Sequence, residues 1–407
     1  MPRYRHKLAY TVLDSGRPVW VDDPSFNLDY HIRHTALPTP GRWEQLCSLT
    51  ARIFSQQLDR SKPLWEMWLI EGLEDDRFAL ITKTHHSLID GIAGVDLATV
   101  LFDLSPEPPP IRHSGKAWQP HPEPGAAELI ASGLRGAARV ALTHPDHALA
   151  RAREAAEGIG EIVWAGLNPA PETPLNVPIG PHRRFYGVAC ELDDFKAIKN
   201  AFGGTVNDVV LAVVSGALRS FLISRGYRTE GVELRALVPV SVRVDDERGE
   251  TGNRLVAMRG PLPVYISDPI QRLRFVSHAM DGLKESKQAV GAEVIAGAQS
   301  FAPPTLLAQA SRLNFSTRLF NLIVTNIPGP QFPLYVLGRE MLQAFPVAFL
   351  PENHGLAIAI MSYNGQMNFG LLGDFDALPD IDQISTSIAA ELQNLLSLAR
   401  ESVPAPA

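Results

Sequence analysis

The feature that most constrains the fold of this chain is a cluster of prolines near its middle. Five prolines fall within residues 168–182. Proline lacks a backbone N–H and fixes φ, so such a cluster continues neither a helix nor a central strand. We therefore predict a linker at 168–183 that separates a domain at 1–167 from a domain at 184–407. The length of 407 residues agrees, because one hydrophobic core seldom organises so long a chain.

Helical and strand patterns alternate on both sides of this linker, which predicts an α/β or α+β fold class. Two local signals are specific. Asn364-Gly365 predicts a tight hairpin, and Thr205 with Asp208 predicts the capping box of a helix. The predicted helices are 43–59, 92–101, 126–165, 205–224, 268–286 and 380–399, and the predicted strands are 64–73, 77–84, 184–192, 233–243, 254–262, 320–327, 355–363 and 367–373.

Composition narrows the function classes. The formal net charge is -7, so no overall positive field favours nucleic acid. The two cysteines, Cys47 and Cys190, lie far apart and fit neither a disulfide framework nor a cysteine-rich zinc site, which suits a reducing compartment. No run of about 18 apolar residues occurs, so we expect no membrane-spanning helix and at most a peripheral membrane contact.

The most distinctive motif is the segment 84–91, Thr-His-His-Ser-Leu-Ile-Asp-Gly. It follows a predicted strand and precedes a helical pattern, a position that commonly presents a reactive side chain. His85 and His86 could be packed structural histidines, metal ligands or a general base with its support. Adjacent strand residues point to opposite faces, which disfavours a shared metal ion, so we predict no metal. A neutral imidazole near pH 7 suits a base that deprotonates a hydroxyl or amine as it attacks a carbonyl.

Motifs of several other enzyme classes are missing from the sequence. It contains no Gly-x-Ser-x-Gly nucleophile elbow, which weakens a serine-hydrolase interpretation. It also contains neither a phosphate-binding Gly-x-x-x-x-Gly-Lys loop nor a Gly-x-Gly-x-x-Gly dinucleotide fingerprint.

Six short blocks in order resemble those of a known family. The segment 84–91 matches the HHxxxDG motif of the CoA-dependent acyltransferase superfamily. The whole chain most resembles the bacterial bifunctional wax ester synthase/diacylglycerol acyltransferase family. Residues 63–66, Pro-Leu-Trp-Glu, resemble its PLW motif, and residues 205–212 resemble its ND segment. The other similar blocks are 237–243, 252–253 and 325–330.

This resemblance implies two chloramphenicol-acetyltransferase-like domains with the active site in a tunnel between them. It implies transfer of a long-chain acyl group from acyl-CoA to diacylglycerol, and to long-chain alcohols in wax ester synthesis. Acyl-CoA is the co-substrate, and no cofactor is expected. His86, the second histidine of the motif, would be the general base, a role usually worth about 10²–10⁴-fold in rate. No covalent acyl-enzyme is required.

The resemblance also suggests roles for other residues. His85 would orient the site, and Asp90 would turn away from the cavity to pair with Arg243, which would lock the two domains together. A turn or helix cap is the alternative for the oxyanion candidates, and a place in the core is the alternative for Trp65. The candidate oxyanion donors are Thr325, Asn326, Asn207 and Gly91, and the candidate acyl-channel residues are Pro63, Leu64 and Trp65.

Members of that family usually carry some tens of residues ahead of the point where this chain starts. The first domain is therefore expected to lack an early strand and helix, and a catalytically idle relative that binds lipid or a partner is the alternative function. Amide-forming transfer, as in peptide-synthetase condensation domains, is a third interpretation, against which the PLW and ND blocks count. We expect a cytoplasmic protein, peripheral at the inner membrane or at lipid inclusions, with acyl-CoA and lipid alcohols as its partners.

Overall fold

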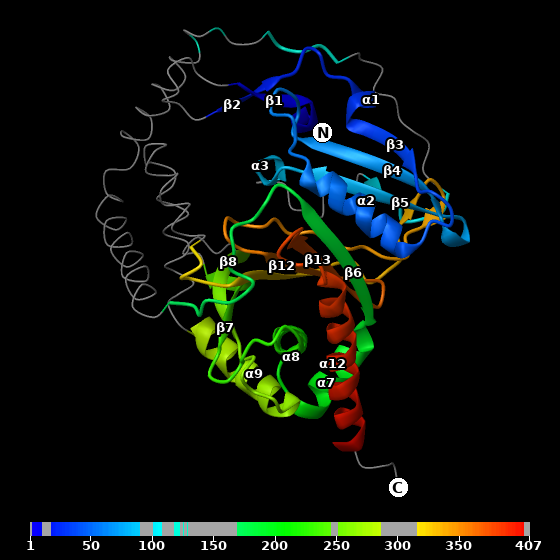
Figure 1. Ribbon diagram of the computed structural model, residues 1–407. Helices are drawn as coiled ribbons and strands as arrows, with labels where there is room; N and C mark the ends of the chain where they lie inside the picture. The colour runs from blue at the N-terminus through cyan, green and yellow to red at the C-terminus, as the bar shows by residue number, and fades with distance from the viewer. Residues whose placement is uncertain are drawn as a thin grey trace. The chain divides into compact units, whose positions relative to one another are not determined.

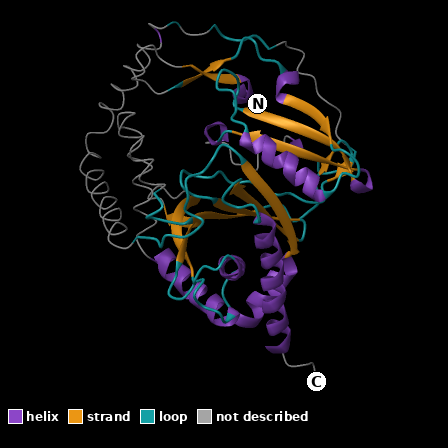
Figure 2. Ribbon diagram, in the orientation of Figure 1, coloured by secondary structure: helices purple, strands orange, loops and turns teal. Residues whose placement is uncertain are grey.

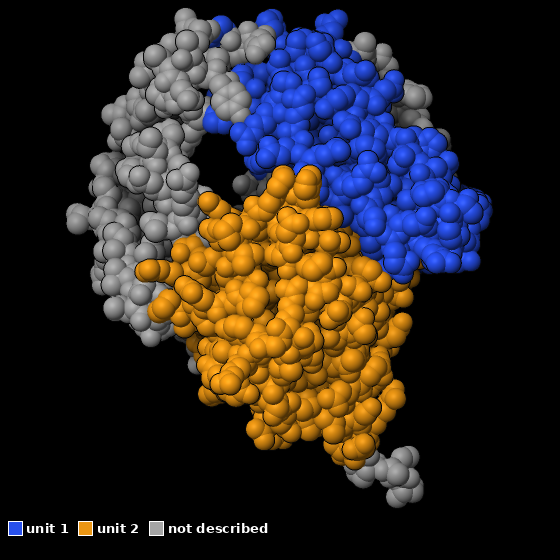
Figure 3. Space-filling model, in the orientation of Figure 1, with its two compact units in different colours: residues 1–149, 303–307, 333–341 blue, residues 150–302, 308–332, 342–407 orange. Residues whose placement is uncertain are grey.

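The computed structural model describes residues 2–9, 18–89, 101–107, 118–122, 125, 128, 169–245, 251–285 and 316–402. The helices predicted at 92–101 and 126–165 lie almost wholly outside these residues. The chain clusters into two compact units (Figure 3). The domain boundaries derived from the sequence stay a prediction. The first unit comprises residues 1–149, 303–307 and 333–341, and the second comprises residues 150–302, 308–332 and 342–407.

The first unit is built on a three-stranded sheet (Figures 1 and 2). Strand β3 (Ile32–Ala36) runs parallel to β4 (Trp65–Leu73), which pairs antiparallel with β5 (Arg77–Thr84). The hairpin predicted at 64–84 is confirmed. Helix α2 (Trp43–Ser55) connects β3 to β4. The other elements of this unit are η1 (Pro2–Arg5), β1 (His6–Ala9), β2 (Val19–Asp22), α1 (Leu28–His31), η2 (Glu74–Asp76), α3 (His86–Ile89), β10 (Tyr335–Val336) and β11 (Arg339–Glu340).

Helix α2 is amphipathic, as its sequence predicts, and its apolar side packs on the sheet. Ile53 of α2 and Ile70 of β4 belong to one buried cluster. The helix was predicted to reach residue 59, but it ends at Ser55. The ammonium group of Lys83 donates to the carbonyl oxygens of Ile53 and Gln56. A side chain of β5 therefore satisfies the carbonyl groups at the end of this helix, a contact that no local sequence pattern announces.

The second unit contains a six-stranded mixed sheet in the order β6-β13-β12-β9-β7-β8. Neighbouring strands are antiparallel, except that β9 runs parallel to both β12 and β7. Four helices cover one face of the sheet (Figures 1 and 2). The strands are β6 (Arg183–Glu191), β7 (Leu234–Asp245), β8 (Thr251–Leu262), β9 (Leu322–Pro328), β12 (Leu356–Tyr363) and β13 (Gln366–Asp374), and the helices are α7 (Leu192–Phe202), α8 (Val206–Ser224), α9 (Pro269–Glu285) and α12 (Ile381–Ser402).

Helix α8 is the central helix of this unit. Among the described residues it is the one helix long and apolar enough to cross a membrane, with a mean hydropathy of 1.7. However, 72% of that apolar window is buried inside the protein. Helices α7, α9 and α12 pack around it (Figure 1). Its apolar composition is therefore that of a core helix, in agreement with the buried helix predicted for residues 205–224.

Two local sequence signals are confirmed in this unit. The Asp208 N–H donates to Thr205 Oγ1 over 3.2 Å, and the Thr205 N–H donates to Asp208 Oδ2 over 2.8 Å, which completes the predicted capping box. Asn364 and Gly365 adopt φ angles of 43° and 83° in the hairpin turn between β12 and β13. Both signals depend on contacts between residues at most three apart, so the local sequence is sufficient to specify them.

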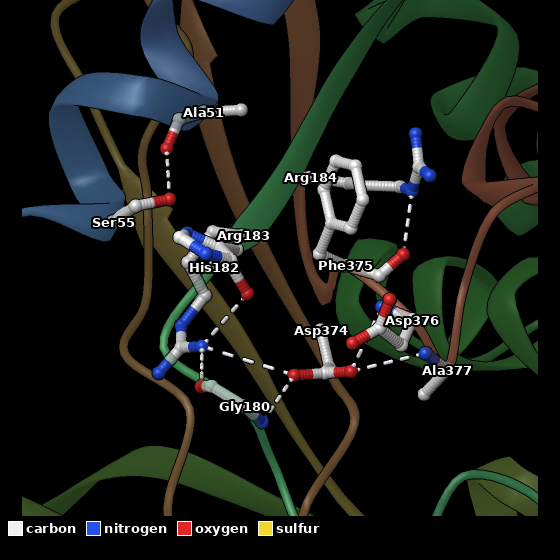
Figure 4. A network of polar contacts seen from close by, with 10 residues as sticks. All are labelled: Ala51, Ser55, Gly180, His182, Arg183, Arg184, Asp374, Phe375, Asp376 and Ala377. Atoms are coloured by element: carbon white, nitrogen blue, oxygen red, sulfur yellow. Dashed lines mark hydrogen bonds and ion pairs between the residues drawn. The ribbon is translucent and has the colours of Figure 1, made fainter.

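A polar network joins the end of β13 to the segment ahead of β6 (Figure 4). The Asp374 carboxylate accepts the Gly180 N–H over 2.7 Å at one oxygen, and the Asp376 and Ala377 N–H groups over 3.1 and 3.0 Å at the other. Arg183 donates to the Gly180 carbonyl oxygen over 2.6 Å. Backbone amides therefore stabilise a carboxylate that is only 2% exposed.

The described part of the predicted linker packs on the second unit. Leu175 is fully buried in the core of this unit. The side chains of Asn176 and Asn321 are hydrogen-bonded over 2.8 Å, and the Asn176 amide also donates to the Asn321 carbonyl oxygen over 3.1 Å. The prolines at 169–181 thus mark a segment without helix or strand, but they do not prevent its burial.

Candidate active site

The histidine motif lies where a strand gives way to a short helix. Strand β5 ends at Thr84 and α3 begins at His86, which confirms the position predicted from the sequence. The strand-alternation argument for His85 and His86 is wrong, because neither histidine belongs to the strand. The side chain of His86 and the whole of Asp90 and Gly91 lie outside the described residues.

His85 is exposed and holds the start of α3. Its Nδ1 atom accepts the backbone N–H of Ser87 over 3.2 Å and lies 2.7 Å from Ser87 Oγ. Its own backbone N–H donates to the Leu64 carbonyl oxygen over 2.9 Å, just beyond the last residue pair of β4 and β5. Because Nδ1 uses its lone pair to accept an amide N–H, a neutral His85 carries its proton on Nε2. These contacts support an orienting role for His85, which stays a prediction.

Three charged side chains, one from each strand, gather on the α2 side of the sheet, and the last of them stands two residues before His85. Glu66 and Lys83 are cross-strand neighbours on β4 and β5, and Arg33 of β3 pairs with Glu66 over 3.2 Å. Burial lowers the pKa of Lys83, and the charge of Glu66 opposes that shift. The group fixes the strand end that leads into His85. A lysine within the apolar strand 77–84 was the sequence signal that could have revealed it.

The predicted acyl-channel residues are buried side by side. Pro63 is buried, Leu64 is 1% exposed and Trp65 is 7% exposed. The Trp65 indole stacks on His31 with ring centroids 4.6 Å apart, and its Nε1 donates to the Tyr4 carbonyl oxygen over 2.8 Å. These contacts agree with the core interpretation of Trp65, and the channel role of the three residues stays a prediction. No sequence signal singled out His31.

Two of the predicted oxyanion donors meet in the second unit. Leu322 and Val324 of β9 pack in the helix-covered core, so Asn326 shares that face and Thr325 lies on the opposite one. The Asn326 Nδ2 group donates to Asn207 Oδ1 over 3.3 Å. The ND segment and the block at 325–330 therefore lie together in the fold, although 119 residues separate the two asparagines in sequence.

The N-terminus of α8 places polar groups around this asparagine pair. Asn207 lies in the first turn of the helix, where backbone N–H groups lack intrahelical partners and the helix dipole is positive. Because its Oδ1 accepts from Asn326, its NH₂ group is the part left to donate to a ligand. The neighbouring Asp208 is 1% exposed, and its carboxylate is engaged by the capping box. This arrangement can donate hydrogen bonds to a developing negative charge.

Of the two residues in the predicted domain lock, only the backbone of Arg243 lies among the described residues. Arg243 of β7 lies opposite Asn253 of β8, so the blocks 237–243 and 252–253 form one antiparallel pair. The Arg243 side chain lies outside the described residues, as does Asp90. The ion pair between them stays a prediction.

Other reactive groups in the described ranges offer less. No group of three or more histidine, cysteine, aspartate or glutamate side chains in these ranges is placed to hold a metal ion. Burial raises the pKa of the Cys190 thiol to about 11, so this thiol is protonated and a weak nucleophile at neutral pH. Chemistry is therefore best sought at the histidine motif.

Family models match the chain in two consecutive parts. The wax ester synthase/diacylglycerol acyltransferase catalytic domain matches residues 1–210, and the C-terminal domain of the same family matches residues 251–396. The chain belongs to the wax ester synthase/diacylglycerol acyltransferase family. The predicted family and the predicted acyltransferase enzyme class are thereby confirmed.

Individual members of this family agree. The chain is 34% identical over 411 residues to tgs1 of Mycobacterium tuberculosis, a protein named as a probable diacylglycerol O-acyltransferase, with 98% of this chain and 85% of that protein covered. The fold matches the wax ester synthase/diacylglycerol acyltransferase from Marinobacter aquaeolei VT8 with a TM-score of 0.68 and 30% identity, over 98% of this chain and 86% of that one. This match confirms the predicted mixed α/β fold class.

Proposed function

We propose that this chain transfers a fatty acyl group from acyl-CoA to diacylglycerol, with His86 as the general base. The observation that carries the proposal is the match to the catalytic domain of the family over residues 1–210, which include the complete histidine motif. The relative tgs1, named for this activity, supports the choice of acceptor. The position of His86 at the first residue of α3, directly beyond a hydrogen-bonded strand, suits a base that must be held rigidly.

The proposed reaction needs one proton to be moved twice. The His86 imidazole removes the proton of the acceptor hydroxyl as the oxygen attacks the thioester carbonyl, which forms the new C–O bond and a tetrahedral oxyanion. Collapse of the oxyanion breaks the C–S bond, and the leaving CoA thiolate takes the proton from His86. The products are the ester and free CoA. Acyl-CoA serves as co-substrate, and the step requires no further cofactor.

Asn207 is our proposed donor to the oxyanion, with Asn326 as the residue that orients it. The contact between the two amides directs the NH₂ group of Asn207 away from Asn326. Loss of one oxyanion donor usually lowers the rate about 10²–10³-fold. Thr325, on the opposite face of β9, and Gly91 remain alternative donors.

The proposed acceptor defines where the protein works. Diacylglycerol with two long chains resides in membranes or lipid bodies, so we propose a cytoplasmic protein that is peripheral at the inner membrane or at lipid inclusions. Helix α8 is buried in the core and does not supply an anchor. Contact with lipid would therefore depend on surface side chains.

Acyl transfer from labelled palmitoyl-CoA to diolein by the purified chain tests this function. We expect His86→Ala to lower the turnover about 10²–10⁴-fold. His278→Ala is the matched control, because His278 is exposed on α9 in the second unit and its loss should leave turnover unchanged. Equal turnover by the wild type and His86→Ala would exclude the general-base role.

The same assay separates two other functions. Hexadecanol as acceptor tests wax ester synthesis, for which the Marinobacter relative is named. If the wild type acylates neither diolein nor hexadecanol, the alternative of an idle relative that binds lipid or a partner is favoured.

The proposed pairing of Asp90 with Arg243 has a test of its own. Arg243→Ala should lower both the unfolding midpoint and the turnover, and Arg243→Lys should restore only part of each, because lysine cannot form a bidentate pair. An Arg243→Ala variant that unfolds no more readily and keeps full activity would show the lock to be wrong.

A further inference from the structure

Two turns of the first unit lie side by side. Leu337 and Gly338 form the two-residue turn between β10 and β11. At the base of this hairpin the Asp103 N–H donates to the Tyr335 carbonyl oxygen over 2.7 Å, and the Tyr335 N–H donates to the Asp103 carbonyl oxygen over 2.8 Å. The backbones stay close beyond this bridge, since a Cβ atom on Gly338 would lie 3.2 Å from the Pro106 carbonyl oxygen.

These turns carry the two most exposed large apolar side chains of the described residues. Leu337 is 76% exposed and Leu104 is 74% exposed. A single exposed leucine is ordinary, but apolar side chains gathered on adjoining turns often mark an interaction site. Residues 104–106 and 337–338 are called the apolar tip below.

The backbone of the tip also disfavours leucine. The φ angles of 52° at Leu337 and 75° at Gly338 belong to a turn that favours the pair Asn-Gly. The equivalent turn of this same chain, with φ angles of 43° and 83°, does contain Asn364 and Gly365. A Cβ atom in the left-handed region lies too close to the following carbonyl oxygen, and asparagine tolerates this better than leucine. Leucine at this position is disfavoured both by the left-handed φ angle and by its exposure to water. Its presence is therefore best explained by a binding partner that buries the side chain.

The charges beside the tip indicate the kind of partner. Three acidic residues, Asp103, Glu107 and Glu340, stand on the two turns against one basic residue, Arg339. Arg339 itself is paired with Asp76, with the Nη2 and Oδ2 atoms 3.6 Å apart. This balance gives no attraction to an anionic membrane or to nucleic acid. Exposed leucines on turns whose described charges are mainly acidic instead suit a zwitterionic lipid surface, into which apolar side chains insert.

We propose that the apolar tip docks the first unit on a zwitterionic phospholipid membrane by inserting Leu337 and Leu104. This inference rests on the proposed function, because the diacylglycerol acceptor resides in a lipid phase that the protein has to reach. Burial of apolar surface drives the docking, so it should change little between low salt and about 1 M salt.

Leu337→Asn separates docking from folding. Asparagine suits the left-handed position, so the urea midpoint of the variant should equal or exceed that of the wild type. Binding to phosphatidylcholine vesicles that contain diolein, measured by flotation, should fall about tenfold, and about 100-fold when Leu104→Asn is added. Ile223→Asn is the matched control, because Ile223 is 49% exposed on α8 in the second unit and should not affect vesicle binding.

Activity distinguishes a failure of this inference from a failure of the proposed function. Leu337→Asn should keep the wild-type rate with diolein dispersed in detergent and should show a higher KM with diolein in vesicles. Wild type that binds vesicles but acylates diolein in neither form would refute the proposed function and leave the docking intact. Vesicle binding by the double variant equal to that of the wild type would overturn the inference. So would binding that requires anionic lipid, or self-association of the chain through Leu337 in place of vesicle binding.

Discussion

We expect Gly216→Ala to destabilise the second unit, although the same exchange usually stabilises a helix. Gly216 lies in the middle of α8, beside the buried ion pair of Arg272 and Glu391. A Cβ atom at position 216 would lie 2.5 Å from Glu391 Cδ and 2.7 Å from Arg272 Nη2. Both distances are shorter than real contacts of a Cβ atom, so the ion pair would have to move.

The magnitude follows from three effects. Alanine favours a helix over glycine by about 1 kcal/mol. An added methyl group in a packed core costs about 1–3 kcal/mol, and the full loss of a partner from a buried ion pair costs about 3–5 kcal/mol. The side chains of Arg272 and Glu391 are only 2% and 12% exposed, and burial lowers the pKa of the first and raises that of the second. Displacement short of separation should therefore give a net loss of about 2 kcal/mol.

Thermal unfolding of the purified chain measures this loss. A change of about 2 kcal/mol should lower the midpoint of the second unit by roughly 4–8 °C. Gly282→Ala is the matched control, because Gly282 lies exposed in α9 and a Cβ atom there would meet nothing within 4 Å beyond the backbone of its own helix. That variant should gain up to about 1 kcal/mol. If both variants shift the midpoint upward, the argument from the ion pair is refuted.

Three further predictions concern single contacts. Burial lowers the pKa of His31 below its ordinary value of 6.5. As the pH falls, the unfolded chain therefore binds a proton before the folded chain does, and stability declines below about pH 6.5. The variant His31→Asn, which can still donate to the Trp65 carbonyl oxygen, should lose less unfolding free energy than the wild type between about pH 7 and pH 5. Gly370→Ala should cost about 1–3 kcal/mol or more in urea unfolding, because its Cβ atom would collide with the backbone oxygen of Pro346; unchanged stability would contradict the close approach. Lys83→Met should destabilise the first unit by about 1–3 kcal/mol, since it removes the side-chain donor to the Ile53 and Gln56 carbonyl oxygens at the end of α2, and Lys83→Arg should recover part of that loss.

The sequence by itself determined the elements whose contacts are local. The capping box of Thr205 and Asp208 and the hairpin turn at Asn364-Gly365 arise from residues at most three apart, so any chain with these sequences favours them. The hairpin of β4 and β5 and the change from strand to helix at the histidine motif follow from short patterns of the same kind. The ordered blocks were also sufficient to predict the family, because each block combines specific residue types with a fixed order along the chain.

Other features depended on pairing between distant parts of the chain. The sequence predicted Asn207 and Asn326 as separate candidates, and only the packing of α8 on the mixed sheet brings their side chains to 3.3 Å. Trp65 likewise stacks on His31, and Lys83 donates to the end of α2, and in both contacts the residues are about 30 positions apart in sequence. No periodicity encodes such contacts, because they form when apolar surfaces of separate elements are buried against each other.

The two tight turns of this chain show the same division most directly. Asn364 and Gly365 form a turn that the sequence predicts, since both residue types favour the positive φ angles that they adopt. Leu337 and Gly338 adopt nearly the same φ angles with a residue that disfavours them, because β10 pairs with β11 and a bridge from Asp103 also holds Tyr335 in place. Local preference decides a turn when it agrees with the fold, and tertiary pairing decides it when the two conflict.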